Sequence, residues 1–466
     1  MEASSLTFAA ANRAAPRAST PDSPPVTKAS FAAARTPSVT LPLRFVITGL
    51  LSLLLGITWL AARPILLAGY HYSPEFVAVT HLFALGWVTS IVMGAMYQLV
   101  PVALETQLYS ERLARWHFGF HLVGFLGMVA MFRIWDMKQV GHFGTILGLG
   151  VGLFVYNLVR TLRRVPRWNV VATAIASGLA WLTLTILAGL FLASAKCWPQ
   201  ISPFSPLAQM HAHAHLGVVG VFLLLILGIS YKLIPMFTLS EVQNHRRATL
   251  SLWLINTGLA GLVVTLALAS PWKLLFALIV ITGLAVYAVE LLAILRARKR
   301  RKLDWGVIYF LTALSLLVPL SILAVILCWP ALPSTEFTTQ LENVYGFLAL
   351  LGVVTFAVLG MLFKIGPFLV WYARYSREIG RHKVPSLAEL YSTRLQAATY
   401  WLYLAGLVAT CASIALADET AVRWSFMLLV VAFLLFATNM GLILSHLFRP
   451  RLEPLPAIGL PKGSPA

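Results

Sequence analysis

Among the side chains of this sequence, histidine can take part in the widest range of chemistry. Two apolar stretches contain histidines. One contains His81, and the other contains the run MHAHAH at 210–215. A neutral imidazole in an apolar segment needs partners for one donor and one acceptor, and a heme iron or metal ion supplies one. We therefore treat His81, His211 and His215 as candidate cofactor ligands, and these three with His213 as candidate metal ligands. The alternative is that each histidine bonds only to carbonyl groups, water or lipid headgroups.

Helical spacing limits which of these histidines can share one site. His211 and His215 are four residues apart and fall on one face of a helix. His213 points about 200° away from both of them. At most two of the three can therefore serve one metal ion or heme if the segment is helical throughout.

The composition places these histidines in a membrane protein. Of the 466 residues 59% are hydrophobic and 11% are charged, and the mean hydropathy is +0.82. Apolar runs of about 20 residues, the length that crosses a bilayer, predict an all-α polytopic fold. Three cysteines without a Cys-x-x-Cys pair give no support to zinc or iron–sulfur chemistry. Twelve membrane helices are predicted, at 45–66, 76–100, 114–135, 141–161, 170–194, 209–236, 249–269, 273–295, 305–329, 344–371, 397–417 and 422–447.

One pattern occurs three times and begins at His81, His215 and Phe347, with starts 134 and 132 residues apart. Such spacing indicates one unit used three times. We predict repeats at about 43–168, 169–303 and 304–449, which form three pseudo-symmetric four-helix arcs. The shared positions are glycine at +5 and +13, an aromatic residue at +16 and proline at +20: Gly86, Gly220, Gly352, Gly94, Gly228, Gly360, Tyr97, Tyr231, Phe363, Pro101, Pro235 and Pro367.

The repeated glycines and prolines also have an architectural explanation. Small residues let membrane helices pack closely without any cofactor, although close approach suits a planar macrocycle as well. The aromatic residue and the proline predict that each patterned helix ends at the membrane surface, at Pro101, Pro235 and Pro367.

The net charge of +19 indicates orientation in the membrane rather than binding of nucleic acid. With both termini in the cytoplasm, 29 of the 35 Lys and Arg residues lie on the cytoplasmic side. This bias follows the positive-inside rule and suits contact with the lipid bilayer and its anionic headgroups. We predict a multi-pass protein of a bacterial inner membrane, with cytoplasmic tails at 1–42 and 450–466. The composition of residues 1–42 predicts disorder, and a transit peptide is the alternative.

The predicted orientation gathers several histidines near the outer face of the membrane. His81, His211, His213 and His215 lie in or near the outer third of their helices, and His71 lies in the loop before 76–100. His142 begins the helix at 141–161 on the same side.

Two further histidines lie in the inner half of the helix at 114–135. His117 and His121 are four residues apart and share a face. They form a second polar site, a proton path, or hydrogen bonds that pack helices together.

The helices and histidines together resemble the catalytic subunit of the heme-copper oxidases. The run at 80–101, THLFALGWVTSIVMGAMYQLVP, is most similar to the second helix of the cbb3-type oxidase and nitric oxide reductase subunits. The resemblance implies that His81 is an axial ligand of a low-spin heme. It also implies that one of His211, His213 and His215 is a copper ligand.

Two departures from that pattern matter for function. The tenth helix of the family supplies two heme histidines, and this sequence has Tyr345 and Phe347 there. The seventh helix of the family carries a copper-binding histidine pair, and here 266–270 reads LALAS. These differences argue against ordinary reduction of oxygen or nitric oxide. The remaining hypothesis is one b-type heme between His81 and either His215 or His211, for electron transfer or a diverged reductase activity.

Two other functions stay open on the sequence. The HAH run loosely resembles the NnrS-type membrane proteins, which implies a non-enzymatic role in heme or copper handling or in nitric oxide stress. A transporter is the other alternative, because internal repeats are common in transporters. Glu290 is nearly the only acidic residue within its predicted helices. An electron donor in the periplasm or a small membrane subunit would be the partner of an electron-transfer protein.

Overall fold

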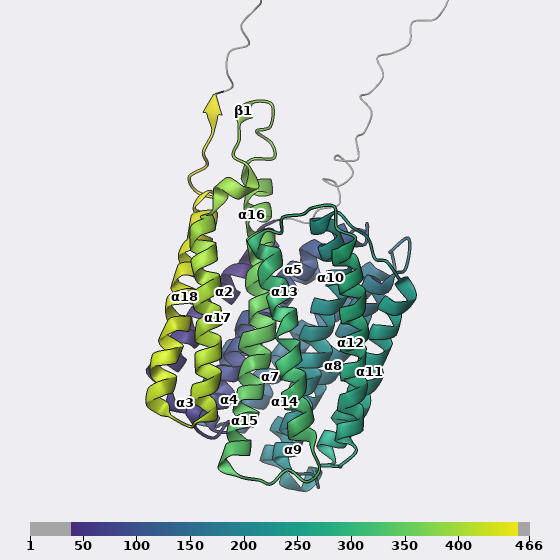
Figure 1. Ribbon diagram of the computed structural model, residues 1–466, viewed down its shortest axis with the longest axis vertical. Helices are drawn as coiled ribbons and strands as arrows, with labels where there is room; N and C mark the ends of the chain where they lie inside the picture. The colour runs from purple at the N-terminus through teal and green to yellow at the C-terminus, as the bar shows by residue number, and fades with distance from the viewer. Residues whose placement is uncertain (1–38, 455–466) are drawn as a thin grey trace, which may run out of the picture.

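Twelve helices that are long and apolar enough to cross a membrane make up most of the structure, a computed structural model that describes residues 39–454. They stand side by side along the long axis of the molecule (Figure 1). The predictions of twelve membrane helices and an all-α fold are confirmed. Most of the predicted N-terminal tail and the end of the C-terminal tail lie outside the described residues.

Three of the membrane-spanning helices change type along their length, from α to π and back to α. These are α4 (Pro74–His81), η1 (Leu82–Thr89) and α5 (Ser90–Ala103); α9 (Pro206–His215), η3 (Leu216–Leu223) and α10 (Leu224–Thr238); and α15 (Glu336–Phe347), η4 (Leu348–Val354) and α16 (Thr355–Arg374). The other spans are α2 (Thr40–Ala62), α6 (Glu111–Ile134), α7 (Met137–Leu162), α8 (Val170–Cys197), α11 (His245–Ala267), α12 (Lys273–Arg296), α13 with α14 (Trp305–Ser315 and Leu317–Cys328), α17 (Thr393–Ala415) and α18 (Glu419–Ser445).

The π segments occur at the same place in each copy of the sequence pattern. They begin directly after the first patterned residue, which is His81, His215 or Phe347. Short π segments inside α-helices are rare, and those that occur often lie at functional sites. The three patterned segments therefore share a backbone feature as well as a sequence. Their arrangement as pseudo-symmetric arcs stays a prediction.

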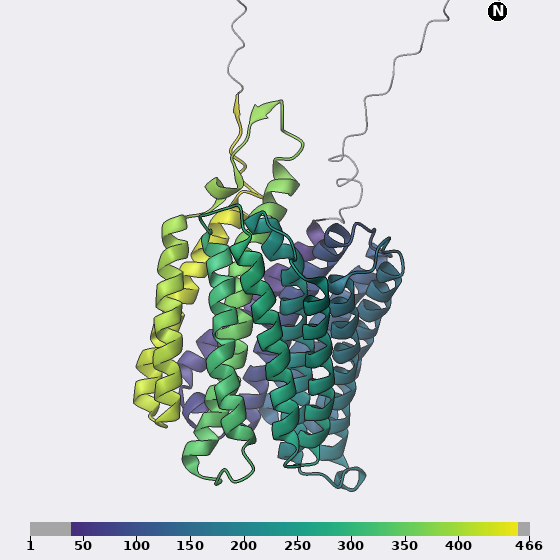
Figure 2. The same ribbon diagram turned by 45° about the vertical axis from the view of Figure 1, so that its right-hand side comes forward.

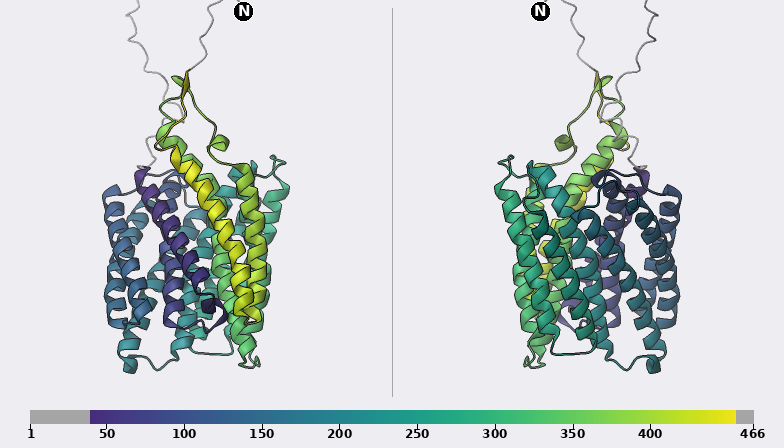
Figure 3. Two further views of the ribbon diagram at one scale, coloured as in Figure 1. Left: turned by 90° about the vertical axis from the view of Figure 1, so that its left-hand side faces the viewer. Right: turned by 90° about the vertical axis from the view of Figure 1, so that its right-hand side faces the viewer.

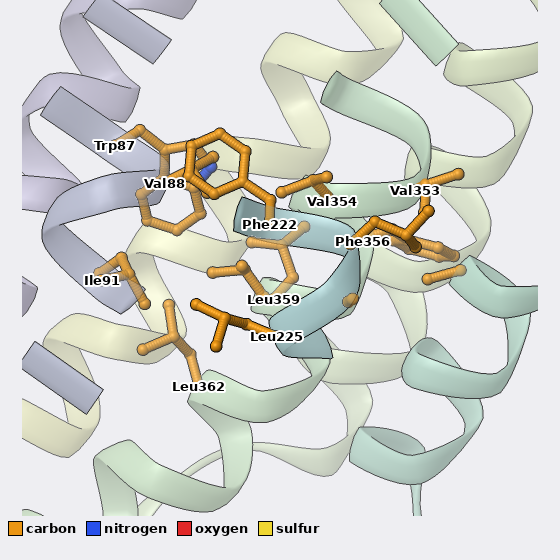
Figure 4. Close-up of a cluster of buried hydrophobic side chains, with 14 of the residues drawn as sticks. Trp87, Val88, Ile91, Phe222, Leu225, Val353, Val354, Phe356, Leu359 and Leu362 are labelled. Carbon is orange, nitrogen blue, oxygen red and sulfur yellow. The ribbon is translucent and has the colours of Figure 1, made fainter. Parts of the chain in front are cut away.

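These three helices form the interior of the bundle. In their most apolar windows 61%, 72% and 83% of the residues are buried, against 22% to 44% in the other spans. Figure 4 shows their side chains meeting at the centre, with Trp87 near Phe222 and Val354. The Trp87 indole Nε1 donates to Thr355 Oγ1 at 3.2 Å, which joins η1 to α16. The outer helices therefore shield a core that the patterned helices make.

The second repeated glycine lets each patterned helix approach a neighbour closely. A Cβ at Gly228 would lie 2.0 Å from the Cβ of Ala174 on α8. A Cβ at Gly360 would lie 2.6 Å from the Cβ of Tyr309 on α13. Neither position has room for a side chain, so packing alone explains these glycines.

The prediction that the repeated prolines end their helices is wrong. Helix α5 continues past Pro101 to Ala103, α10 continues past Pro235 to Thr238, and α16 continues past Pro367 to Arg374. Membrane helices tolerate proline where surrounding helices satisfy the freed backbone groups.

The helix predicted at 344–371 begins earlier than hydropathy indicated. It starts at Glu336, where Thr335 forms a capping box with Thr338. The added turns are polar, so a search for apolar runs passes over them. They carry Glu342 and Asn343, which face the cavity described below.

A polar contact at the start of the third membrane helix recurs in each of the three predicted repeats, at α6, α11 and α17. In each case a side chain of the fourth helix bonds the backbone just before the third helix, 47 residues earlier in the chain. We call this the capping contact. It joins Asn157 to Ser110, Glu290 to Gln243 and Asn244, and Asn439 to Ser392, at 2.7–3.0 Å.

The short strands β1 (His382–Lys383) and β2 (Glu453–Pro454) pair antiparallel beyond the membrane-spanning helices. Figure 2 and Figure 3 show that they project from the end of the bundle where α2 begins. Lys383 and Glu453 form an ion pair of 2.8 Å across the strands. Four short elements complete the described fold: α3 (Ile65–Ala68), η2 (Pro199–Ile201), η5 (Leu387–Leu390) and the bridge of Ile379 to His382.

Replacing Glu290 tests the capping contact. Glu290 is fully buried, accepts from two backbone N–H groups and pairs with Arg247 at 2.9 Å. Glu290→Ala leaves these donors unpaired and is expected to cost about 2–4 kcal/mol of stability. Thermal unfolding in detergent measures the loss, with exposed Glu241→Ala from the same loop as the control. A melting temperature equal to that of the control would contradict a structural role.

Candidate functional site

A cavity of about 400 Å³ brings together five of the six histidines that the sequence predicts near the outer face, all except His142. It lies among α4, α9 and α15, at the end of the bundle opposite β1 (Figure 1). Most of its lining is apolar. The polar residues that line it include His71, His81, His211, His213, His215, Glu342, Asn343, Tyr345, Lys196 and Lys273.

His81 is held in one orientation by its own helix. Its Nδ1 lies 2.8 Å from the carbonyl oxygen of Val77, one turn earlier. Only an N–H can donate to that oxygen, so Nδ1 carries the proton and Nε2 keeps its lone pair. The ring packs on Phe132, with centroids 4.5 Å apart. His81 is therefore oriented as metal-binding histidines are, with the second nitrogen bonded to a carbonyl.

The ring that faces His81 belongs to His213. The two centroids are 6.4 Å apart, and the planes differ by 17°. The buried Nδ1 of His213 has no hydrogen-bond partner in the described part of the chain. Gly189 on α8 makes room for this ring, because a Cβ there would lie 3.1 Å from His213 Cε1. The sequence paired His81 with His215 or His211, and the structure brings His213 to it instead.

His215 is already engaged by its neighbours. Its Nδ1 lies 2.8 Å from the His211 carbonyl oxygen, and its Nε2 lies 3.2 Å from the Tyr345 hydroxyl. Since Nδ1 donates, the hydroxyl of Tyr345 donates to Nε2 and uses that lone pair. Tyr345 stands where the resemblance predicts a heme-binding histidine. The polar partner of His215 in this structure is therefore a phenol.

His211 lies against His71 and Glu342, and we call these three residues the His71 cluster. The rings of His211 and His71 have centroids 5.7 Å apart and differ by 24°. One ligand atom from each residue lies within 4.8 Å of the other two. Burial lowers the pKa of His71, which lies in the loop before α4, so its imidazole is neutral at pH 7.

The histidines of α9 thus serve two sides of the cavity. His213 faces α4 and α8, while His211 and His215 face α15, as their helical spacing predicted. Sequence reasoning missed Glu342, because it lies before the predicted start of its helix. His71 was placed at the outer face but not in a ligand set. The sequence alone could not show that His71 lies beside Glu342, because that contact depends on how the helices pack.

Two lysines give the cavity a positive lining. The Nζ of Lys196 lies over the rings of Tyr72 and Trp135, at 4.7 and 5.7 Å from their centroids. The Nζ of Lys273 donates to the Leu327 carbonyl oxygen at 3.4 Å. Neither ammonium forms an ion pair with a carboxylate among the described residues. They suit an anionic group at the cavity.

His117 and His121 lie outside this cavity and pack helices together. The Nδ1 of His117 lies 2.9 Å from the Tyr97 hydroxyl, and the Nε2 of His121 lies 2.9 Å from Ser90 Oγ. The second repeat has the same contact at the same spacing, with Ser251 in place of His117 and Tyr231 in place of Tyr97. Because a serine fills the equivalent place, the packing interpretation of His117 is favoured.

Comparisons with known proteins bear on the fold. No protein-family model and no curated protein matches the sequence. Among the solved structures that match is a heme-copper terminal oxidase, a dimer studied by cryo-electron microscopy. The TM-score is 0.59 at 12% identity, over 90% of this chain and 84% of the oxidase chain. The chain has a heme-copper oxidase-like fold. The match confirms the fold that the sequence resemblance implied, and the twelve apolar helices confirm the prediction of a multi-pass membrane protein.

Replacing His117 tests whether this residue packs helices together or binds a cofactor. His117→Ala removes the partner of Tyr97 and is expected to cost about 2–4 kcal/mol of stability, without loss of bound metal or heme. Unfolding in detergent and metal analysis measure the two effects. Ser251→Ala, on the equivalent contact, should cost about 1 kcal/mol. Loss of a cofactor at unchanged stability would refute the packing role.

Proposed function

We propose that this protein binds one b-type heme between His81 and His213 and transfers electrons through it near the outer face of a bacterial inner membrane. The paired rings carry the proposal, with centroids 6.4 Å apart and planes 17° apart. Metal–nitrogen bonds of about 2 Å to two opposed imidazoles place ring centroids roughly 6 Å apart. The observed separation fits that arrangement.

The state of the two imidazoles supports the same assignment. The proton of His81 is on Nδ1, which leaves Nε2 free to bind iron. His213 has a buried nitrogen without a partner among the described residues, and a buried polar atom of this kind is costly. Gly189 leaves the space that the His213 ring occupies.

The rest of the cavity suits a heme as well. Its volume of about 400 Å³ lies in the range of cofactor sites, and its lining is largely apolar with a few polar groups. Lys196 and Lys273 line it without carboxylate partners in the described residues, and their charges suit the propionates of a b-type heme. The heme would supply a one-electron iron couple. The Val77 carbonyl bonded to His81 would increase the electron donation of that ligand.

The proposal is electron transfer rather than oxygen reduction because the second ligand set differs. Tyr345 and Phe347 replace the helix 10 histidines of the family that the sequence resembles, and Tyr345 bonds His215. An electron donor in the periplasm or a small membrane subunit would dock at the outer end of the bundle. With the histidine cavity toward the periplasm, both termini lie in the cytoplasm.

A second candidate is a non-enzymatic heme or copper handling protein, as in the NnrS-like alternative. The His71 cluster favours it, because imidazole and carboxylate both bind copper(II) and zinc. A transporter is less well supported. Glu290, its candidate carboxylate, is held by backbone N–H groups and Arg247 in the capping contact.

The absorbance spectrum of the purified protein, oxidised and dithionite-reduced, tests the heme proposal. We expect a Soret band and one b-type heme per chain by pyridine hemochrome. His81→Ala and His213→Ala should each reduce the heme content at least tenfold, because each removes an axial ligand.

The matched control is His142→Ala, since His142 is exposed and its Nδ1 lies 3.3 Å from the Gln139 side-chain oxygen, outside the cavity. Its heme content should equal that of the wild type. A wild type without heme would refute the proposal. Full heme in His213→Ala with loss in His211→Ala or His215→Ala would refute the pairing.

A further inference from the structure

We propose that His71, His211 and Glu342 bind one divalent transition-metal ion of the copper or zinc kind, separately from the heme site. The three residues come from the loop before α4, from α9 and from α15. Their ligand atoms lie within 4.8 Å of one another. The site does not depend on the heme proposal, because it shares neither His81 nor His213.

The loop that carries His71 is fixed by α15. The Gln340 side-chain amide donates to the Ala68 carbonyl oxygen at 2.7 Å, and that of Asn343 donates to the Gly69 carbonyl oxygen at 2.7 Å. Asn343 also donates to the Gln340 oxygen at 2.9 Å. These contacts hold His71 beside the helix turn that presents Glu342. The juxtaposition is therefore built into the structure.

The side chain of His71 is only 9% exposed, and neither of its buried ring nitrogens makes a hydrogen bond of ordinary geometry in residues 39–454, although the side chain of Asn343 lies close to the ring. Its Nε2 lies 3.7 Å from Glu342 Oε2, which is beyond hydrogen-bond range. A buried imidazole left in this way costs free energy, and a bound cation would satisfy it. This unpartnered side chain is the observation that points to a ligand.

An ion would draw the three ligand atoms closer together. Bonds of about 2.0–2.2 Å in a tetrahedral site place ligand atoms roughly 3–3.5 Å apart. The ligand atoms of the His71 cluster lie within 4.8 Å of one another, so the side chains would rotate toward a bound ion. Two imidazole nitrogens and one carboxylate oxygen suit zinc or copper(II), whereas calcium and magnesium prefer oxygen ligands.

The remaining coordination positions would open into the cavity. Lys273 also lines the cavity, and the positive charge of its ammonium would weaken the binding of a cation there.

Metal binding by the full-length protein, purified with a tag that lacks histidine, tests the proposal. After treatment with EDTA, the protein is titrated with Cu²⁺ or Zn²⁺ and analysed by inductively coupled plasma mass spectrometry. The wild type should bind one ion per chain, with nitrogen hyperfine structure in the copper EPR spectrum. His71→Ala and Glu342→Gln should each weaken binding at least tenfold. His142→Ala, which lies outside both sites, should bind as the wild type does.

The outcomes separate this site from the heme. The Soret absorbance of His71→Ala should equal that of the wild type, so heme and metal are lost by different variants. Glu342→Gln conserves volume and covers the case in which His71→Ala fails to fold. No bound ion in the wild type, or equal binding by Glu342→Gln, would overturn the proposal, whatever the heme content.

Discussion

Close packing of three buried helices at the centre of the bundle determines where every other feature lies. The patterned helices approach their neighbours through glycines such as Gly228 and meet one another through Trp87, Phe222 and Val354. In hydrocarbon each helix must satisfy its own backbone, so only side chains are free to build a site. The ends of these helices that lie opposite β1, where the π segments begin, line one cavity, and α4 and α9 present histidines to it.

Helix α9 divides that cavity because three histidines in a run cannot all face one way. His213 turns toward α4, and His211 and His215 turn toward α15. One short segment thus contributes to both the proposed heme site and the proposed metal site. Each site takes its other members from residues distant in the sequence. The heme-copper oxidase-like fold brings these distant residues together.

The sequence was enough for the helices and for the cluster of histidines, since apolar length and helical spacing are local properties. It also separated His213 from His211 and His215 correctly. It could not tell which histidine ring lies beside His81, because that depends on the rotation of one helix against another, and the structure places His213 there. It missed Glu342 because a polar extension of a membrane helix has no hydropathy signal. Proline misled it because neighbouring helices compensate for the broken backbone bond.

The contacts of Gln340 and Asn343 with the loop before α4 join segments more than 270 residues apart. Most other polar contacts of the fold, including the capping contacts, link helices that follow closely in the chain. During synthesis these two contacts of the loop therefore form only after α15 has entered the membrane. Since α15 lines the cavity, the cavity is complete only late in biogenesis, and any metal or heme would be loaded into a nearly complete chain.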